Sequence, residues 1–308
     1  MTQPPAPARR ITVVGDALID ELRDPDGSRE FVGGAALNVA VGLSLLGQPV
    51  TLITMLGDDA DGDRIRAYLR DYRVRLVESP SAHGTSRAIS DRTDGEPRYE
   101  FNAAAKRRGI RFDAATRAAL DEADLVVVSC FPFDVAEQYG ELVAAIARPE
   151  ERVIVDGNPR AGMLADPTAF LANFEDFASR ALLAKVGDED AVLLLGDSLD
   201  AFVDRLRGRP GAHGAILATA GRDGATVYHD DTTVRADIVA LPDPIVDTMG
   251  AGDATLSAVV HDIAQHGLPQ TPDAWTAALD DAMTIAAATV RHEGALLRVP
   301  QSEEAFPS

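Results

Sequence analysis

The chain has 308 residues, a formal net charge of −20 and 46% hydrophobic residues. This length fits one large domain, or a large domain with a small addition, and the composition excludes general disorder. Nucleic-acid-binding proteins need a basic surface. The one dense basic run, Lys106-Arg107-Arg108, is expected to be solvated surface. We therefore expect no nucleic-acid partner.

Cysteine content and hydropathy indicate the cellular setting. The single cysteine, Cys130, excludes a disulfide within the chain, and its apolar surroundings predict a position in the core. No segment approaches the roughly 18 apolar residues of a membrane span. Residues 1–10 lack the apolar centre of a signal peptide. These features predict a soluble, cytoplasmic protein without a membrane partner.

Short β-branched runs alternate with longer helical patterns along the chain. The expected strands are Ile11–Val14, Val50–Met55, Val74–Glu78, Leu125–Ser129, Arg152–Val155, Leu182–Ala184 and Ala215–Ala218. The expected helices are Ala35–Leu46, Asp61–Asp71, Ala114–Asp121, Val135–Ala147, Pro167–Ser179, Ala251–His266 and Thr271–Arg291. Apolar strands that alternate with helices predict a mostly parallel sheet with helices on both faces. The predicted fold class is therefore doubly wound α/β.

Two segments break this alternation. Glu21–Val32 has no helical period, and Thr85–Phe101 alternates apolar and polar residues around Asp94-Gly95, which is a hairpin signal. We predict that both segments form a small β-sheet lid over the edge of the main sheet. The expected organisation is one domain, residues 1–308, with lid strands inserted at about 21–32 and 85–101.

Three glycine-rich loops could bind ligands, at residues 33–38, 219–224 and 247–253. A glycine turn at a helix N-terminus directs unpaired N–H groups to one point, which suits an anion. Gly250-Ala251-Gly252 fits this description. The following Asp253 has two interpretations: a carboxylate that stabilises the first turn of a helix, or a general base for a hydroxyl that attacks a phosphate.

Several other phosphate-binding classes are excluded by inspection. The chain has two lysines, and neither follows a glycine, so the Gly-x4-Gly-Lys motif of P-loop proteins is absent. His-Arg-Asp and Asp-Phe-Gly are absent as well, which excludes a protein kinase. The first strand ends in a single Gly15 rather than Gly-x-Gly-x-x-Gly, which disfavours an NAD-dependent oxidoreductase.

The loops together resemble the ribokinase-like (PfkB) sugar kinase family. The resemblance depends on Gly33-Gly34 with Asn38, on Gly57-Asp58-Asp59 with Gly62, and on Asp247-Thr248-x-Gly250-Ala251-Gly252-Asp253. It extends from Ile11 to about Pro300. The family implies transfer of the γ-phosphoryl group of ATP to a sugar hydroxyl, with Mg²⁺. It also implies a β-sheet lid that covers the sugar and often forms a homodimer contact.

The resemblance assigns roles residue by residue. Asp253 is the implied base, and the N–H groups of Gly250, Ala251 and Gly252 are the implied anion hole. The implied sugar contacts are Asp20, Gly34, Asn38 and Arg160. The implied nucleotide contacts are Lys185, Thr219, Gly221 and Gly224. The implied metal ligands are Asp190 for Mg²⁺ and Asp247 for a monovalent cation such as K⁺. From the residues alone, Asn38 could equally be a helix cap and Arg160 a partner in a structural ion pair.

Two positions depart from the family pattern. Gly187 and Asp190 replace the usual Asn and Glu of Asn-x-x-Glu, and the shorter Asp190 is expected to weaken a water-mediated Mg²⁺ contact, for which Asp188 or Glu189 could substitute. Met249 stands where Thr is common, at a position where a backbone carbonyl role would tolerate the change.

The sugar is indicated by one further segment. Residues 156–160, Asp-Gly-Asn-Pro-Arg, resemble the Asp-Pro-Asn-x-Arg segment of fructokinases. The sequence therefore favours a fructokinase. Ribokinase, 2-keto-3-deoxygluconate kinase and nucleoside kinase remain alternatives within the family, and a non-catalytic sugar-sensing homologue is an alternative of a different class.

Overall fold

A sheet of nine strands runs through the protein, for which a computed structural model describes residues 8–25, 27–91, 98–147, 149–212 and 214–300. In spatial order the strands are β13 (Thr232–Ala236), β12 (Ala225–His229), β11 (Ala215–Thr219), β10 (Leu183–Gly187), β9 (Val153–Asp156), β8 (Leu125–Ser129), β1 (Ile11–Gly15), β4 (Val50–Leu56) and β5 (Arg75–Pro80). All neighbours from β5 to β11 pair in parallel, and β12 and β13 are antiparallel. The predicted mostly parallel sheet is confirmed.

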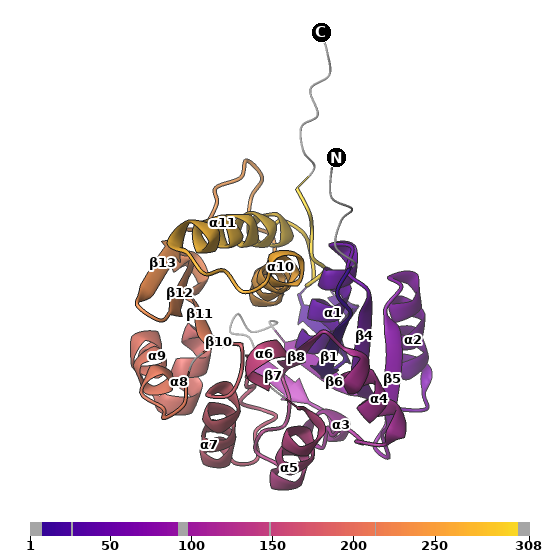
Figure 1. Cartoon of the computed structure of the whole chain (residues 1–308). Coiled ribbons are helices and arrows are strands. Elements are labelled where there is room, and N and C mark those ends of the chain that lie inside the picture. Colours follow the sequence, from indigo (N-terminus) through magenta and orange to yellow (C-terminus); the bar gives the residue numbers. More distant parts are fainter. Residues whose placement is uncertain (1–7, 26, 92–97, 148, 213, 301–308) are drawn as a thin grey trace, which may run out of the picture.

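Helices cover both faces of this sheet (Figure 1). One core contains side chains of α1 (Ala35–Leu45), α2 (Ala60–Asp71), α10 (Ala251–His266) and α11 (Pro272–Thr289). The other contains side chains of α4 (Ala114–Glu122), α5 (Ala136–Ala145), α7 (Pro167–Ala178), α8 (Asp188–Leu195) and α9 (Leu199–Arg207). Along β8, Leu125 and Val127 face the first core while Val126 and Val128 face the second. Strands buried on both faces are mostly apolar, which is why they could be predicted from the sequence. The short helices α3 (Ala103–Lys106) and α6 (Pro149–Arg152) and the 3₁₀ turn η1 (Gly221–Asp223) complete the helical elements of the described chain.

The sequence analysis did not expect α8, α9, β12 and β13, nor the short elements α3, α6 and η1. In β12, the buried Ala225 and Val227 alternate with the partly exposed Thr226 and Tyr228. An antiparallel strand with one face toward the solvent has this alternation rather than a continuous apolar run. The search for apolar runs therefore ended at β11 and missed the antiparallel end of the sheet.

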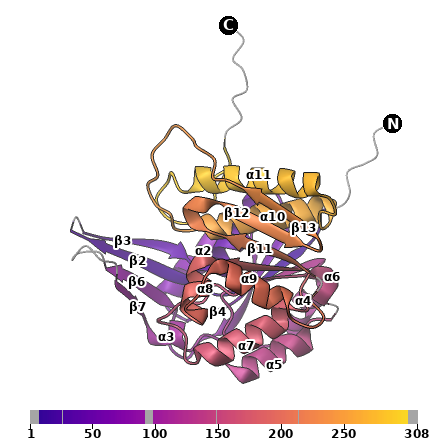
Figure 2. The same cartoon turned by 90° about the vertical axis from the view of Figure 1, so that its left-hand side faces the viewer.

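A second, smaller sheet contains the two segments that interrupt the sequence pattern. Its strands, in the order β3-β2-β6-β7, are β2 (Leu18–Asp24), β3 (Gly27–Gly33), β6 (Arg87–Asp91) and β7 (Arg98–Phe101). Figure 2 shows this small sheet projecting from one side of the molecule. The predicted small β-sheet is confirmed, while the predicted Asp94-Gly95 turn lies outside the described residues.

The small sheet has two distinct faces. Asp20 of β2 pairs directly with Phe31 of β3, and cross-strand partners point to the same face. Glu21 and Glu30 share the opposite face, where both form ion pairs with Arg87 of β6. Arg87 Nε also lies 2.5 Å from Asp61 Oδ2 of α2. This ion-pair cluster connects the small sheet to the helix layer of the large one.

The antiparallel end of the large sheet is covered by α11. This helix contains the only tryptophan of the chain, Trp275, whose side chain is fully buried. The Trp275 ring lies 6.0 Å from the ring of His229 at the end of β12. Among the described helices, none combines the length and the apolar character needed to cross a lipid bilayer.

Candidate active site

The carboxyl ends of the parallel strands meet at one edge of the large sheet. Gly15 of β1 pairs with Ser129 of β8, and Ser129 with Asp156 of β9. Gly187 of β10 pairs with Thr219 of β11. The strand order reverses between β1 and β8, because β4 and β5 extend the sheet on the other side of β1. Ligands of such folds bind outside the carboxyl ends at the reversal point, so the candidate site lies at this edge.

The N-terminus of α10 contains the motif that the sequence singled out. Gly250 has φ +79°, and a Cβ at this position would lie 2.6 Å from Cβ of Ala295. Glycine is required there for both conformation and space. The N–H groups of Gly252 and Asp253 find no acceptor among the residues that the structure describes. Together with the helix dipole, these free donors suit an anion.

Asp253 is buried, with 8% of its surface exposed, in the first turn of α10. Its side chain makes no capping hydrogen bond; instead, Oδ2 accepts a 2.8 Å hydrogen bond from Nδ2 of Asn38, the fourth residue of α1. Burial raises the pKa of Asp253 to about 6, and the Asn38 hydrogen bond opposes this rise. A carboxyl with this pKa is ionised at neutral pH and still basic enough to accept a proton.

A buried charge cluster lies beside the first turn of α10. Nζ of Lys185 lies 3.0 Å from Oδ2 of Asp156, and both side chains are almost fully buried. A Cβ on Gly252 would lie 3.6 Å from Lys185 Nζ, so the ammonium group is next to the candidate anion site. Burial lowers the pKa of Lys185, but Asp156, Asp190 and Asp253 outweigh burial and raise it. Lys185 therefore stays charged at neutral pH.

Asp190 occupies the third position of α8. Its Oδ2 accepts a 2.8 Å hydrogen bond from the N–H of Gly187, which precedes the helix. Burial raises the pKa of Asp190, Asp156 adds to the rise, and Lys185 opposes it. The residue that replaces the family glutamate thus caps α8 with one oxygen and has the other available.

Asp20 lies on the small sheet and faces the same edge. A Cβ on Gly33 would lie 2.1 Å from Asp20 Oδ2, so glycine at 33 leaves room for this carboxylate. Burial raises the pKa of Asp20 to about 7, Asp16 adds to the rise, and Arg160 opposes it. Arg160 is exposed and forms no ion pair with any described residue. The ion-pair interpretation of Arg160 therefore finds no support in the described part of the chain.

Gly34 precedes α1 in a backbone conformation that favours glycine, with φ +107°. The carboxylate of Asp16, at the end of β1, accepts a 3.0 Å hydrogen bond from the N–H of Ala36 in the first turn of α1. Burial raises the pKa of Asp16, while this hydrogen bond and the nearby Arg108 oppose the rise. Asp16 therefore anchors the helix that carries Gly34 and Asn38.

Asp247 precedes the α10 motif. Its Oδ1 accepts a hydrogen bond from the N–H of Met249 at 3.1 Å, and its Oδ2 accepts one from the N–H of Gly294 at 3.2 Å. The carboxylate thus joins two stretches of chain that lie 47 residues apart. We call residues 247–252 the α10 loop and residues 293–295 the 293–295 turn.

The predicted nucleotide contacts gather at the end of β11. Thr219 ends the strand beside Gly187, and its hydroxyl donates to the carbonyl of Val186 at 3.4 Å. Gly221 opens the 3₁₀ turn η1, and Gly224 closes it. A Cβ on Gly221 would lie 3.9 Å from Oδ2 of Asp188, so this group adjoins the first turn of α8 rather than Asp253.

Sequence reasoning misjudged one neighbour of the site. Arg108 was expected on solvated surface, but only 7% of it is exposed. Its Nε donates to the carbonyl of Cys130 at 3.2 Å. The predicted core position of Cys130 is confirmed, with 1% exposed. Arg108 and Asp16 were missed because their proximity depends on which strand ends meet, and no local pattern reports that.

The residues present can be tested against a cation at this edge. Oδ1 of Asp156 is buried without a hydrogen-bond partner in the described chain. Burial, with a further contribution from Asp156, raises the pKa of Asp190, and a cation beside this carboxylate would oppose that rise. No group of three or more His, Cys, Asp or Glu side chains among the described residues is arranged to hold a metal alone. The set suits an ion that keeps most of its waters and arrives with phosphates, which is how Mg²⁺ binds in proteins.

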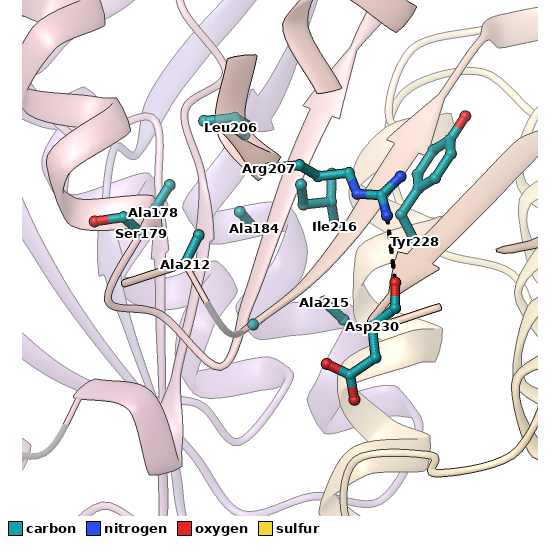
Figure 3. Close-up of a pocket in the computed structure, with 11 residues that line it drawn as sticks. Ala178, Ser179, Ala184, Leu206, Arg207, Ala212, Ala215, Ile216, Tyr228 and Asp230 are labelled. Carbon is teal, nitrogen blue, oxygen red and sulfur yellow. Dashed lines mark hydrogen bonds between the residues drawn. The ribbon is translucent and has the colours of Figure 1, made fainter. Parts of the chain in front are cut away.

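A cavity of about 200 Å³ lies elsewhere, where β10 and β11 begin (Figure 3). It is bordered by Ala184, Ala215 and Ile216, and Arg207 reaches across it to the carbonyl of Asp230 at 3.3 Å. The predicted site residues lie at the opposite ends of these strands, so this cavity is separate from the candidate site.

Comparison with known proteins places the chain among sugar kinases. The family described as pfkB family carbohydrate kinase matches residues 9–302. A fructokinase of Klebsiella pneumoniae is 27% identical over 96% of this chain and 97% of its own length. A probable fructokinase-6, chloroplastic, of Arabidopsis thaliana is 27% identical over 95% of this chain and 80% of its own length.

Solved structures share the fold. The crystal structure of a fructokinase from Vibrio cholerae O395, in fructose-, ADP- and calcium-bound form, gives a TM-score of 0.77 at 22% identity, covering 94% of this chain and 95% of that one. Aminoimidazole riboside kinase from Salmonella enterica gives 0.73 at 20% identity, covering 93% and 95%.

Proposed function

Because the chain belongs to the pfkB family of carbohydrate kinases, which makes it an ATP-dependent sugar kinase, we propose that its acceptor is fructose and that Asp253 is the base of the transfer. One observation supports the second part above all. Burial raises the pKa of the Asp253 carboxyl to about 6. Its side chain makes no capping hydrogen bond with the helix backbone, and it lies beside free N–H groups at the N-terminus of α10. A carboxylate that served only as a cap would accept a hydrogen bond from a backbone N–H at the start of the helix.

The reaction follows from this arrangement. The Asp253 carboxylate accepts the proton of the sugar hydroxyl as that oxygen bonds to the γ-phosphorus of ATP. The bond from the γ-phosphorus to the bridging oxygen breaks, and its electrons leave with ADP. The N–H groups of Gly250 and Gly252 stabilise the charge on the transferred group. The N–H of Ala251 donates to the carbonyl of Thr248 at 3.3 Å and joins them when this long hydrogen bond opens. The Lys185 ammonium adds positive charge at the same point.

The remaining roles in this proposal are those that the family resemblance implies. Asp20, Gly34, Asn38 and Arg160 contact the sugar, and Thr219, Gly221 and Gly224 contact the nucleotide. Asp190 would hold Mg²⁺ through water, and Asp247 would contribute to a K⁺ site. Bound with ATP, Mg²⁺ would neutralise phosphate charge.

Fructose is supported by the relatives named fructokinase, which match nearly the whole chain. A second acceptor class is suggested by Arg160, whose exposed guanidinium has no ion-pair partner among the described residues and would suit a carboxylate. The sugar acid 2-keto-3-deoxygluconate is therefore the second candidate.

ADP release measured with a panel of acceptors tests the proposal. The panel contains fructose, ribose, 2-keto-3-deoxygluconate and adenosine, each with Mg²⁺ and ATP, and Asp253→Asn serves as the control for contaminating kinases. We expect the highest kcat/KM with fructose and no comparable turnover in the variant. A different preferred acceptor would overturn fructose alone. Fructose binding by calorimetry without turnover would identify a sugar sensor instead.

A further inference from the structure

The 293–295 turn, which follows α11, contacts the small sheet on one side. Oε1 of Glu293 lies 2.5 Å from Nη1 of Arg29 in β3. A Cβ on Gly294 would lie 3.2 Å from Cδ1 and 3.6 Å from Cε1 of Phe31. The Phe31 ring therefore rests against the backbone of this turn. The Arg29–Glu293 pair is solvent-exposed and is expected to stabilise little, so Phe31 provides the firmer contact.

The same turn contacts the α10 loop on its other side. The N–H of Gly294 donates to Asp247, whose other oxygen accepts the N–H of Met249. Cα of Ala295 would lie 2.7 Å from a Cβ on Gly250, so the two backbones are in close contact. The three residues of the 293–295 turn thus lie between the small sheet and the α10 loop and contact both. A displacement of the turn would move both Met249 and Gly250.

Phe31 is also tied to the proposed sugar contact. It pairs with Asp20 across the β2–β3 ladder, and both side chains point to the same face. A shift of this strand pair around a bound sugar would therefore move the Phe31 ring against Gly294. Ile19 and Val32, on the opposite face, have no such path to the α10 loop through these contacts.

We propose that Phe31 is a positioning residue. Through its contact with Gly294, it couples the binding of the sugar at Asp20 to the conformation of the α10 loop, and through that loop to the position of Asp253. The inference rests on the proposed function, because it takes Asp20 as a sugar contact and the α10 loop as the phosphoryl site. It assigns a task in the reaction to a side chain that no resemblance singled out.

Hydrogen exchange without any ligand tests the contact itself. Phe31→Ala is compared with Phe101→Ala, a matched change in the same small sheet. Phe101 packs on Gly162, where a Cβ would lie 2.6 Å from its ring, and not on the 293–295 turn. We expect exchange at the Met249 amide to become several-fold faster in Phe31→Ala and to stay unchanged in Phe101→Ala. Equal exchange in wild type and Phe31→Ala would overturn the proposal, and so would equal acceleration in both variants.

Binding of a non-hydrolysable ATP analogue, AMP-PNP with Mg²⁺, tests the coupling. Its Kd is measured with and without saturating fructose. In the wild type we expect fructose to tighten AMP-PNP binding about five-fold or more. The factor should fall to near one in Phe31→Ala and recover in part in Phe31→Leu. The coupling would be overturned if Phe31→Ala left the effect of fructose on the Kd of AMP-PNP unchanged. It would also be overturned if the wild type bound fructose and its Kd for AMP-PNP did not change. If fructose does not bind at all, the proposed acceptor fails, while the ligand-free exchange experiment still decides whether Phe31 positions the α10 loop.

Discussion

The carboxylate of Asp253 is buried, where the charged form is costly in free energy. Burial therefore raises its pKa, which makes the group a better proton acceptor. Asp253→Asn preserves size and cannot accept a proton. We therefore expect kcat to fall at least about 100-fold with both KM values nearly unchanged. Steady-state kinetics measure this. Asp273→Asn, an exposed carboxylate in the first turn of α11, is the matched control and should keep full turnover. Retained turnover in Asp253→Asn would assign the base elsewhere.

The same carboxyl makes stability depend on pH. Burial raises the pKa of Asp253 from 3.8 to about 6, so between these values the folded protein holds a proton that the unfolded chain has lost. The free energy of unfolding therefore decreases as pH rises through this range. Asp253→Asn has no carboxyl to ionise, so it avoids the free-energy cost of burying a charged carboxylate at high pH. At pH 8 it should be more stable than wild type by about 1–3 kcal/mol, with a smaller difference at pH 5. Urea denaturation at both pH values measures this, and a variant less stable at pH 8 would contradict it.

Asp20 offers a second single-residue test. A charged hydrogen-bond partner is worth about 1.5–3 kcal/mol, so Asp20→Ala should raise the KM for the sugar about ten- to a hundred-fold. AMP-PNP binding without sugar should remain nearly intact, which calorimetry would report. An unchanged sugar KM would mean that Asp20 supports only the β2–β3 pair.

For single residues, the sequence was informative about the candidate site where the interacting groups are neighbours in the chain. Gly250-Ala251-Gly252-Asp253 could be interpreted as a helix N-terminus with a carboxylate because all its parts are neighbours in the chain. The hydrogen bond between Asn38 and Asp253 spans 215 residues, and neither the local pattern nor the family resemblance predicted that these two side chains touch. Arg108 was wrongly placed on the surface, since its burial depends on the end of β8, which lies 22 residues later.

Among the elements, α8 combines two tasks in one side chain. Asp190 caps the helix through the Gly187 N–H and is the proposed water-mediated contact to Mg²⁺. Asp190→Ala should raise the Mg²⁺ concentration for half-maximal activity and, through the lost cap, cost about 1 kcal/mol of stability. A Mg²⁺ titration and urea denaturation measure the two effects separately. If stability falls while the titration is unchanged, Asp188, Glu189 or ATP alone holds the metal.

The elements that escaped prediction share a physical reason. Buried parallel strands such as β8, with four apolar residues before Ser129, stand out in the sequence. The β12–β13 hairpin is buried on one face, and α8 has only eight residues. The exception is α9, which has nine residues like the predicted α4 and was missed despite its Ser198 N-cap and its buried Phe202, Val203 and Leu206. Short, half-exposed elements are stabilised by the sheet on which they pack, and their own sequence carries a weak signal.

In the molecule as a whole, the small sheet meets the large sheet at one edge, and different interactions stabilise the two sheets. The large sheet lies between two apolar cores, whereas the face of the small sheet opposite Asp20 has ion pairs around Arg87, one of them to Asp61 of α2. We predict that fructose slows hydrogen exchange at Arg98–Phe101 several-fold, because the ligand joins the small sheet to the large one. Strand β8, buried in the large sheet, is the internal control. Equal exchange in β7 with and without fructose would mean that this sheet does not cover the sugar.

The buried position of Trp275 gives the protein a built-in optical label. Because it is the only indole in the chain, fluorescence reports one location, the packing of α11 on β12 beside His229. Its emission should be blue-shifted in the folded protein and move to the red only when α11 separates from the large sheet. Far-ultraviolet circular dichroism averages over every strand. A denaturation curve in which the dichroism changes before the fluorescence would therefore reveal that secondary structure elsewhere is lost while α11 still packs on the large sheet, with no dye or engineered probe.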